Sequence, residues 1–223
     1  MNKYPLSTNT WDNKELEAIQ SVIDSDNYTM GDHVTQFEND FGKFINRKYC
    51  LMVSSGSSAN LCAFSALTSP KLGDRRLKPG DEVITTAWTF VAPIEAICAL
   101  GATAVPVNLD SSFHMDPKQI ESKITSKTKA LVAVPMWASP DMHALVAICN
   151  KHSIVLIEDA AQSLGAKFKG KKLGTFGKLG SFSFDAGKTL HVGEGGMVIT
   201  DDKELYEKVA EFSDHGHMHI EGV

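Results

Sequence analysis

Two helical stretches open the chain, because apolar residues recur there at intervals of three and four positions. The apolar positions are Leu16, Ile19, Val22 and Ile23 in the first stretch, and Val34, Phe37 and Phe41 in the second. Asp12 and Glu15 precede the first stretch as a capping-box pair, which indicates where that helix begins. Seven short apolar runs follow and are typical of buried parallel strands: Cys50–Val53, Glu82–Thr86, Thr103–Val107, Ala130–Pro135, Ile154–Ile157, Ser181–Phe184 and Met197–Thr200.

Helical segments separate most of these runs. The clearest is expected to have Ser139 as its N-cap and Pro140 at its first helical position, and to end near Lys151. Another is expected to start at Asp201, with Glu204 three residues later, and to bury three apolar side chains: Leu205, Val209 and Phe212. Strands and helices in repeated alternation predict an α/β sheet that helices cover on both faces.

The composition is that of a globular protein with a substantial core. Of 223 residues, 43% are hydrophobic and 22% charged, and the formal net charge is -5, which argues against nucleic acid as a partner. Apolar runs stay well short of the ~20 residues that cross a bilayer. The N-terminus lacks the pattern of a secretory signal, so a cytoplasmic protein is expected. Residues 68–80 form a locally basic, polar stretch that favours a surface loop, and four cysteines are expected to be buried free thiols: Cys50, Cys62, Cys98 and Cys149.

In such sheets a ligand lies beyond the carboxyl ends of the strands, so the residues that follow each strand matter most. Residues 54–60 form a Ser/Gly-rich turn before an apolar helical stretch, where small residues and free N–H groups suit an anion. The same turn is also a common way to cap a helix. Trp88 and Phe90 follow another strand, and they could form a flat wall for a ring or belong to the core.

Two further strand ends carry charged side chains. Glu158 and Asp159 close an apolar strand, where a carboxylate facing a protonated ring nitrogen would be paired, although an aspartate N-cap explains the position as well. Lys188 follows a buried strand among small residues, where a partly desolvated amine suits Schiff-base chemistry, although most lysines lie at the solvated surface. An anion cradle, an aromatic wall, an acid and a lysine together are the parts that bind and activate pyridoxal 5′-phosphate.

These segments resemble a known family. The sequences SSGSSAN, GDEVITTAWTFVA, IEDAAQSLGA and FSFDAGKTLHVGEGGMVIT resemble the motifs of the DegT/DnrJ/StrS sugar aminotransferases, in the same order, from about Pro5 to about Gly216. The resemblance implies the large domain of a pyridoxal-phosphate transferase of fold type I, with a mixed, mostly parallel sheet flanked by helices. Residues 1–25 would form an N-terminal segment and helix and residues 26–223 the cofactor-binding domain, while the family's smaller C-terminal domain would be missing.

The resemblance also implies roles around the ring of the cofactor. Lys188 matches the catalytic lysine that binds the cofactor covalently and then moves a proton between Cα and C4′. Asp159 matches the acid that pairs with the pyridinium nitrogen, and Gln162 matches the residue beside the phenolic oxygen. Phe90 matches the aromatic residue that stacks on the ring, whereas Trp88 is expected to border the substrate pocket.

Four small residues match the phosphate site of the family. Ser57 and Ser58, with the backbone after Gly56, match the phosphate cradle, and Ser183 matches a hydroxyl that also reaches the phosphate. A metal is not expected. The alternating His215, His217 and His219 could converge on one only in an extended segment, and a loop near the active site is the preferred interpretation.

The resemblance implies a transaminase that works in two half-reactions. An amino acid, expected to be glutamate or glutamine, gives its nitrogen to the cofactor, which then aminates a keto or aldehyde sugar that is often nucleotide-linked. The expected partners are this amino-acid donor, the sugar substrate and a second copy of the chain in a homodimer, with neither nucleic acid nor membrane. Residues 27–31 resemble the family's loop that approaches the substrate at the dimer interface.

Other features leave alternatives open. Residues 69–84 and 55–61 resemble the branch that removes the C3 hydroxyl of a CDP-linked keto-deoxysugar, but that branch has histidine where this chain has Lys188, which favours transamination. Residues 212–220 resemble instead transaminases that aminate the terminal carbon of an octulosonate. Without a C-terminal domain the chain is expected to turn over poorly. A remnant that binds pyridoxal phosphate, or only a partner subunit, without turnover is the other alternative.

Overall fold

The structure is a computed structural model that describes residues 10–136 and 139–215. All seven expected runs are strands of one sheet, in the order β1 (Tyr49–Val53), β9 (Gly196–Thr200), β8 (Leu179–Ser183), β5 (Val155–Asp159), β4 (Thr128–Ala133), β2 (Glu82–Thr86) and β3 (Thr103–Val107). Neighbouring strands are parallel except at β9, which runs antiparallel to both β1 and β8. The sheet is therefore mixed and mostly parallel, as expected, although the expectation that β9 is parallel is wrong.

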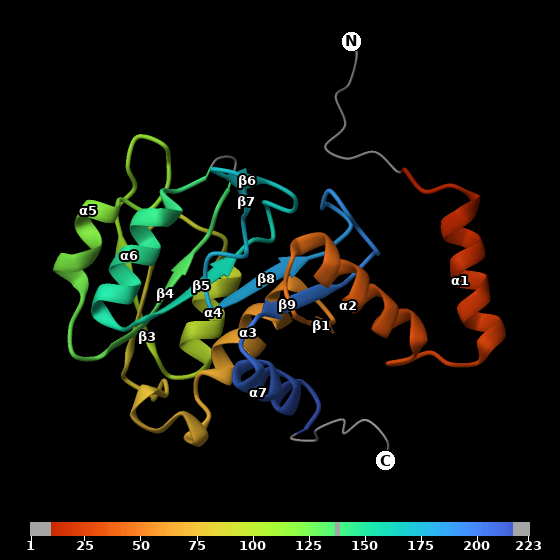
Figure 1. Cartoon of the computed structure of the whole chain (residues 1–223), viewed down its shortest axis with the longest axis horizontal. Helices are drawn as coiled ribbons and strands as arrows, with labels where there is room; N and C mark the ends of the chain where they lie inside the picture. Colours follow the sequence, from red (N-terminus) through yellow and green to blue (C-terminus); the bar gives the residue numbers. More distant parts are fainter. Residues whose placement is uncertain (1–9, 137–138, 216–223) are drawn as a thin grey trace, which may run out of the picture.

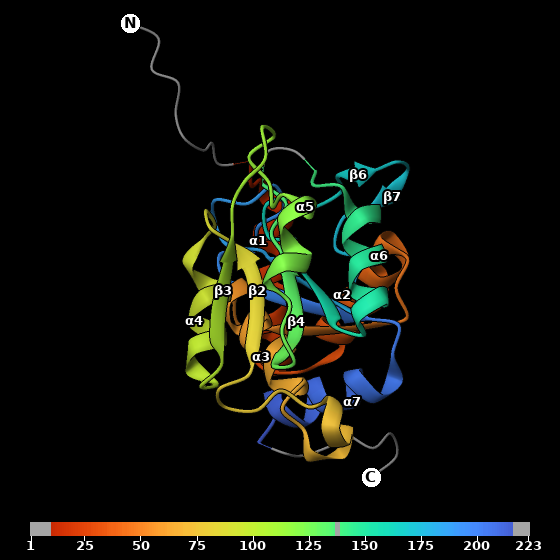
Figure 2. The ribbon, with the colours of Figure 1, turned by 90° about the vertical axis from the view of Figure 1, so that its left-hand side faces the viewer.

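Helices cover both faces of this sheet. One face carries α3 (Gly56–Ala66), α4 (Val91–Ala99) and α7 (Lys203–Ser213), and the other carries α2 (Asp32–Ile45), α5 (Pro117–Ile120) and α6 (Met142–His152). Figure 2 shows α4 and α6 on opposite sides of β2 and β4. The three-layer arrangement matches the expected α/β class.

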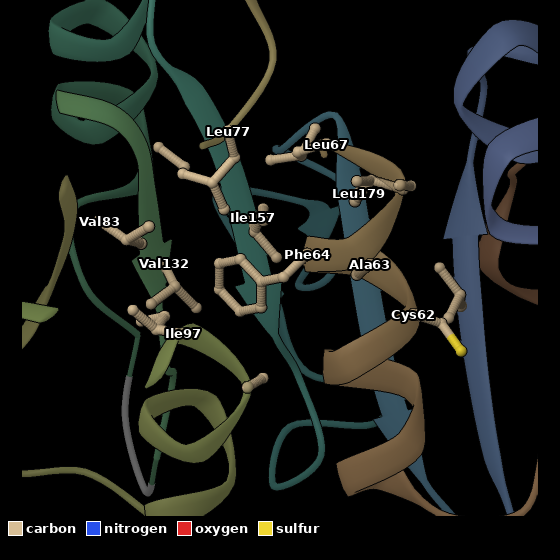
Figure 3. Packing of buried hydrophobic residues seen from close by; sticks show 14 of the residues in the cluster. Cys62, Ala63, Phe64, Leu67, Leu77, Val83, Ile97, Val132, Ile157 and Leu179 are labelled. Carbon is tan, nitrogen blue, oxygen red and sulfur yellow. The ribbon is translucent and has the colours of Figure 1, made fainter. Parts of the chain in front are cut away.

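The core on the α3 side is centred on Phe64. This side chain is fully buried and packs between α4 and the sheet, close to Ile97, Val132 and Ile157 (Figure 3). The same cluster contains Leu77, which lies within the stretch expected to be a polar surface loop. That expectation is partly wrong, because the stretch contains the 3-10 segment η1 (Pro70–Arg75) and buries two of its leucines: Leu72 and Leu77.

Two helix starts differ from the expected ones. Helix α6 begins at Met142 and not at Pro140, because the side chain of Asp141 accepts the backbone N–H of Ala144 and caps the helix there. Helix α7 is capped by Asp202, whose side chain accepts the N–H of Leu205. Asp201 instead pairs with the guanidinium of Arg47 (2.5 Å) and with the backbone N–H of Lys48 (2.9 Å), which keeps it out of the helix.

The exposure of two further groups corrects the sequence-based expectations. Leu205 and Val209 of α7 are buried as expected, but Phe212 is 48% exposed. The four cysteines are free thiols, of which Cys50, Cys62 and Cys149 are buried while Cys98 is exposed. Short elements were not expected, namely the hairpin of β6 (Lys167–Phe168) and β7 (Lys171–Lys172) and the 3-10 segment η2 (Glu121–Lys123). In the described ranges, each helix is too short or too polar to span a bilayer.

Helix α1 (Asn13–Ser25) lies beside the body of the molecule (Figure 1). Its capping box between Asp12 and Glu15 is present as expected. None of its residues is buried, however, and its apolar side chains remain about half exposed: Leu16, Ile19 and Ile23. Just before the helix, the ring of Trp11 stacks on His191, three residues after Lys188, with 5.7 Å between centroids and 6° between planes.

Candidate active site

A cavity of about 240 Å³ opens at the carboxyl ends of β4, β5 and β8. The N-terminus of α3 reaches the same edge of the sheet, because β1, which precedes α3, runs parallel to β8. Seven of the eight residues expected to form the site line this cavity: Gly56, Ser57, Phe90, Asp159, Gln162, Ser183 and Lys188. Residues from four separate stretches of the sequence therefore meet in one space.

Asp159 is the last residue of β5 and is only 3% exposed. Its Oδ2 accepts a hydrogen bond from Asn60 Nδ2 (2.9 Å), and its Oδ1 accepts one from the N–H of Ala161 (3.1 Å). Burial raises the pKa of this carboxyl above its ordinary value, while the two hydrogen bonds and the positive charge of Lys188 lower it. The N-cap alternative is wrong, since turns and not a helix follow β5.

Within the described residues, Asp159 forms no ion pair. The charge of Lys188 acts on this carboxylate only from beyond ion-pair distance, and the accessible side of the carboxylate faces the cavity. The site therefore fits a ligand with a protonated ring nitrogen.

The neighbouring Glu158 has a different and structural task. It is fully buried, and its carboxylate accepts three backbone N–H groups, those of Gly174 (2.7 Å), Phe176 (2.5 Å) and Gly177 (2.6 Å). Burial raises its pKa, while these three donors lower it. Glu158 thus holds the turn before β8, and of the two acids only Asp159 lines the cavity.

The start of α3 is the candidate anion seat. Ser55 is the N-cap, and its Oγ accepts the N–H of Ser58 (3.1 Å). Gly56 and Ser57 occupy the first turn, where helix N–H groups have no partner within the helix. Gly56 is needed because a Cβ there would stand 2.6 Å from the Cβ of Ser183, which brings the helix start against the end of β8.

Ser58 is the expected site residue that does not line the cavity. Its hydroxyl lies 2.9 Å from Ser54 Oγ and 3.0 Å from Ser55 Oγ, within the capping turn itself. Ser55 and Ser58 belong to the helix cap, whereas Ser57 lines the cavity and remains available for an anion. The two interpretations of this turn, helix cap and anion cradle, are therefore compatible.

Lys188 lies in the loop between β8 and β9 and is half-buried, so a fully solvated surface position is excluded. The loop is closed by backbone hydrogen bonds, from Lys188 N to the carbonyl of Asp185 (2.8 Å) and from Val192 N to that of Phe184 (3.0 Å). In residues 10–136 and 139–215, the amine of Lys188 makes neither a hydrogen bond nor an ion pair. An amine that faces a cavity without a bound partner is available for reaction.

The aromatic residues after β2 do not belong to the core, because Trp88 is 45% and Phe90 is 55% exposed. Phe90 lines the cavity directly before α4. Trp88 does not line it and packs against Phe113 with 6.1 Å between ring centroids.

Asn60 lines the cavity, although it was not predicted as a site residue. A signal was present, because Gly56 and Asn60 are four residues apart and so share one face of α3. Two acids at the cavity were also missed as site residues: Asp185 and Glu194.

A larger hollow, of about 420 Å³, surrounds Arg47 near the start of β8. Arg47 donates to Asp201 and to the carbonyls of Thr175 and Gly177, which are structural bonds. The volume of this hollow is greater, but the smaller cavity contains the unpaired amine and the unpaired acid. In the described residues, no cluster of His, Cys, Asp and Glu could hold a metal ion, while His217 and His219 lie outside them.

Comparison with known proteins agrees with this arrangement. The model of the DegT/DnrJ/EryC1/StrS aminotransferase family matches residues 9–222. GDP-4-keto-6-deoxy-D-mannose 3-dehydratase of Yersinia pseudotuberculosis is 40% identical over 218 residues, which are 97% of this chain and 55% of the relative. GDP-perosamine synthase of Escherichia coli O157:H7 is 36% identical over 219 residues, which are 97% of this chain and 58% of the relative.

A solved structure shows the same fold. The E. coli GDP-4-keto-6-deoxy-D-mannose-3-dehydratase with bound hydrated PLP superimposes with a TM-score of 0.86 at 38% identity, over 92% of this chain and 53% of that one. This chain spans about half the length of the relatives that it matches.

Proposed function

Because this chain belongs to the DegT/DnrJ/EryC1/StrS aminotransferase family, we propose that it binds pyridoxal phosphate and belongs to an enzyme that transfers an amino group from an amino acid to a keto or aldehyde sugar. One observation carries the proposal. A single cavity contains a half-buried amine and a buried carboxylate, neither of which forms an ion pair within the described residues, together with the start of a helix. These three groups fit the aldehyde, the ring nitrogen and the phosphate of that cofactor.

Four side chains would hold the ring. Lys188 would bind the cofactor covalently through Nζ, and Asp159 would pair with the protonated ring nitrogen. Phe90 would lie against the ring face, and Gln162 would contact the phenolic oxygen. When bound, the cofactor withdraws electrons from the Cα of the substrate, which is the chemistry that no side chain supplies.

The phosphate would lie at the start of α3. The free N–H groups and the helix dipole there favour a negative charge. Ser57 is exposed at this turn, and Ser183 lies beside Gly56 at the end of β8, so both hydroxyls are placed to donate to phosphate oxygens. In this arrangement the phosphate fixes one end of the cofactor and Asp159 the other.

Lys188 would also act as the proton carrier. With the cofactor bound, Nζ would accept the proton from the substrate Cα as a general base and would give it back as a general acid. Lys188 suits this role because it lines the cavity and, within the described residues, forms no ion pair. Glutamate is the expected amino donor.

Dehydration of a keto-deoxysugar is the second candidate function. It is favoured by the 40% identity to GDP-4-keto-6-deoxy-D-mannose 3-dehydratase. The name of that relative specifies a GDP-linked sugar, whereas the resemblance of residues 69–84 and 55–61 implied a CDP-linked one. The dehydratase branch carries histidine at the position of Lys188, so the lysine favours amination. A remnant that binds the cofactor without turnover is the third possibility.

The protein, loaded with pyridoxal phosphate, should be incubated with isotope-labelled glutamate and a panel of nucleotide-linked keto sugars. Amination predicts a labelled sugar with the small mass gain that marks C=O becoming CH–NH2. Dehydration predicts an unlabelled sugar that has lost its C3 hydroxyl. A protein that binds the cofactor but changes none of the sugars would support the remnant.

A homodimer is also proposed. The apolar stripe of α1 (Leu16, Ile19 and Ile23) is exposed, and so are Tyr28 and Met30 in the loop after it, which a second copy could cover. Light scattering at micromolar concentration should give twice the chain mass. A monomer at that concentration would contradict the proposal for this chain.

A further inference from the structure

A buried chain of hydrogen bonds runs from β8 to β5 through α3. Ser181 Oγ donates to Asn60 Oδ1 (2.6 Å), and Asn60 Nδ2 donates to Asp159 Oδ2 (2.9 Å). Asn60 and Ser181 are each 1% exposed, and Asp159 is 3% exposed. All three side chains are thus almost fully buried, with Asn60 and Asp159 in the wall of the cavity and Ser181 behind them.

The order of donors and acceptors fixes the amide of Asn60. Because an ionised carboxylate can only accept, Asn60 turns its Nδ2 group towards Asp159. Its Oδ1 is then left to accept from the hydroxyl of Ser181, whose Oγ also lies 3.4 Å from the carbonyl oxygen of Glu158. The reverse orientation would place the amide oxygen against a carboxylate oxygen, and two acceptors repel each other. Asn60 therefore gives Asp159 one defined donor in an otherwise dry environment.

On the premise of the proposed function, we propose that Asn60 is a positioning residue: it keeps Asp159 ionised and aimed at the ring nitrogen of the cofactor. The carboxylate has two donors, Asn60 on Oδ2 and the N–H of Ala161 on Oδ1. Burial favours the protonated acid, and both donors favour the carboxylate. Loss of the Asn60 donor would move the shared proton from the ring nitrogen towards Asp159, and a ring without its proton withdraws fewer electrons.

A purely structural role for Asn60 is the rival explanation, since it also joins α3 to the sheet. Ser65 provides the matched control. It lies on the same helix and is 3% exposed, and within the described residues its buried hydroxyl has no hydrogen-bond partner. Ser65→Ala therefore alters the packing of α3 without touching the hydrogen bonds to Asp159.

The test uses Asn60→Leu, which keeps the size of the side chain and removes the donor. Wild type and variants are loaded with pyridoxal phosphate, and the visible absorbance of the lysine-bound cofactor is titrated with pH. Asn60→Leu should move the midpoint to higher pH by on the order of one unit, equal to a tenfold change in proton affinity. The reason is that an unprotonated ring withdraws less charge from the nitrogen joined to Lys188.

Ser181→Ala should shift the midpoint in the same direction but less, because Asn60 keeps its donor and loses only its fixed orientation. Ser65→Ala should leave it unchanged. A wild-type midpoint in folded, loaded Asn60→Leu overturns the proposal. If that variant does not fold, an unshifted midpoint in Ser181→Ala overturns it instead. A wild-type protein that gives no visible band with the cofactor refutes the proposed function, which is a separate outcome.

Discussion

Gly56 and Ser183 touch where the first turn of α3 meets the end of β8. A methyl group on Gly56 would stand 2.6 Å from the Cβ of Ser183 and 3.1 Å from its Oγ, so only glycine permits this approach. The contact places the free N–H groups of the helix beside a strand that leads directly to Lys188. It therefore sets the distance between the anion seat and the amine.

Gly56→Ala should weaken the binding of pyridoxal phosphate. The added methyl group forces α3 away from β8, which displaces the N–H groups from the phosphate. A loss of affinity of about tenfold or more is expected, equal to about 1.4 kcal/mol. Titration of the cofactor absorbance against protein concentration measures it.

Ser183→Gly is the matched background for this substitution, because it removes the Cβ that the new methyl group would meet. Gly56→Ala should cost much less affinity in Ser183→Gly than in wild type. Equal costs in both backgrounds would show that the contact with Ser183 is not the cause.

Glu158→Gln should destabilise the fold, since an amide can no longer accept all three backbone N–H groups of the turn at residues 174–177. The free energy of unfolding is expected to fall by about 2–4 kcal/mol, as for a broken buried network. Urea denaturation measures it. Glu207→Gln, at a surface pair 3.8 Å from Lys203, is the control and should change stability by less than about 0.5 kcal/mol. A similar loss in both variants would contradict the account of Glu158.

Asp159→Asn should alter how stability depends on pH in the cofactor-free protein. The folded pKa of Asp159 is raised by burial above its ordinary 3.8, so the folded state binds the proton more tightly than the unfolded state. Asp159 therefore stabilises the fold below the unfolded pKa, and this contribution is lost as the pH rises through the folded pKa. Asparagine does not titrate, so Asp159→Asn does not show this loss of stability as the pH rises.

The stability of Asp159→Asn relative to wild type should therefore increase as the pH rises above about 4. Urea denaturation without cofactor at several pH values tests this. A constant or decreasing difference would mean that the native carboxylate is well compensated. Glu158 titrates in both proteins, so its contribution cancels.

Cys98 should be the thiol that reacts quickly with a disulfide reagent in the native protein, because it alone of the four is exposed. Burial raises the pKa of Cys50 and Cys149 to about 12 and that of Cys62 to about 11, so these thiols stay protonated and covered. A colorimetric assay at neutral pH should give one fast thiol, absent in Cys98→Ser. Two or more fast thiols would contradict the described packing.

The sequence predicted the sheet well because buried strands are recorded as short apolar runs, and all seven were found. The predicted direction of β9 was wrong, because the apolar pattern of a strand that is buried on both faces is the same whether the strand runs parallel or antiparallel to its neighbours. The predicted first residue of a helix was wrong where two candidate N-caps lie close together in the sequence. Ser139 and Asp141 compete in this way, and only the hydrogen bond from Ala144 to Asp141 decides between them.

The candidate site was predicted from strand ends, yet its internal connections were not. The pairing of Asn60 with Asp159 depends on how α3 lies across β5, and this is a tertiary relationship that neither segment encodes alone. The exposure of Cys98 and Phe212 was missed for a similar reason. Apolar surroundings in sequence do not show which face of a helix meets the sheet.

The central claim is that the amine at position 188 holds pyridoxal phosphate covalently. The most direct measurement is the visible absorbance of the purified chain after addition of the cofactor, in wild type, Lys188→Ala and Lys178→Ala. Lys178 is the control, because it is exposed at the start of β8 and does not line the cavity. The account predicts a protein-bound visible band in wild type and Lys178→Ala that is reducible onto the chain by borohydride, and no such adduct in Lys188→Ala. A colourless wild-type protein, or an adduct that persists without Lys188, would contradict it.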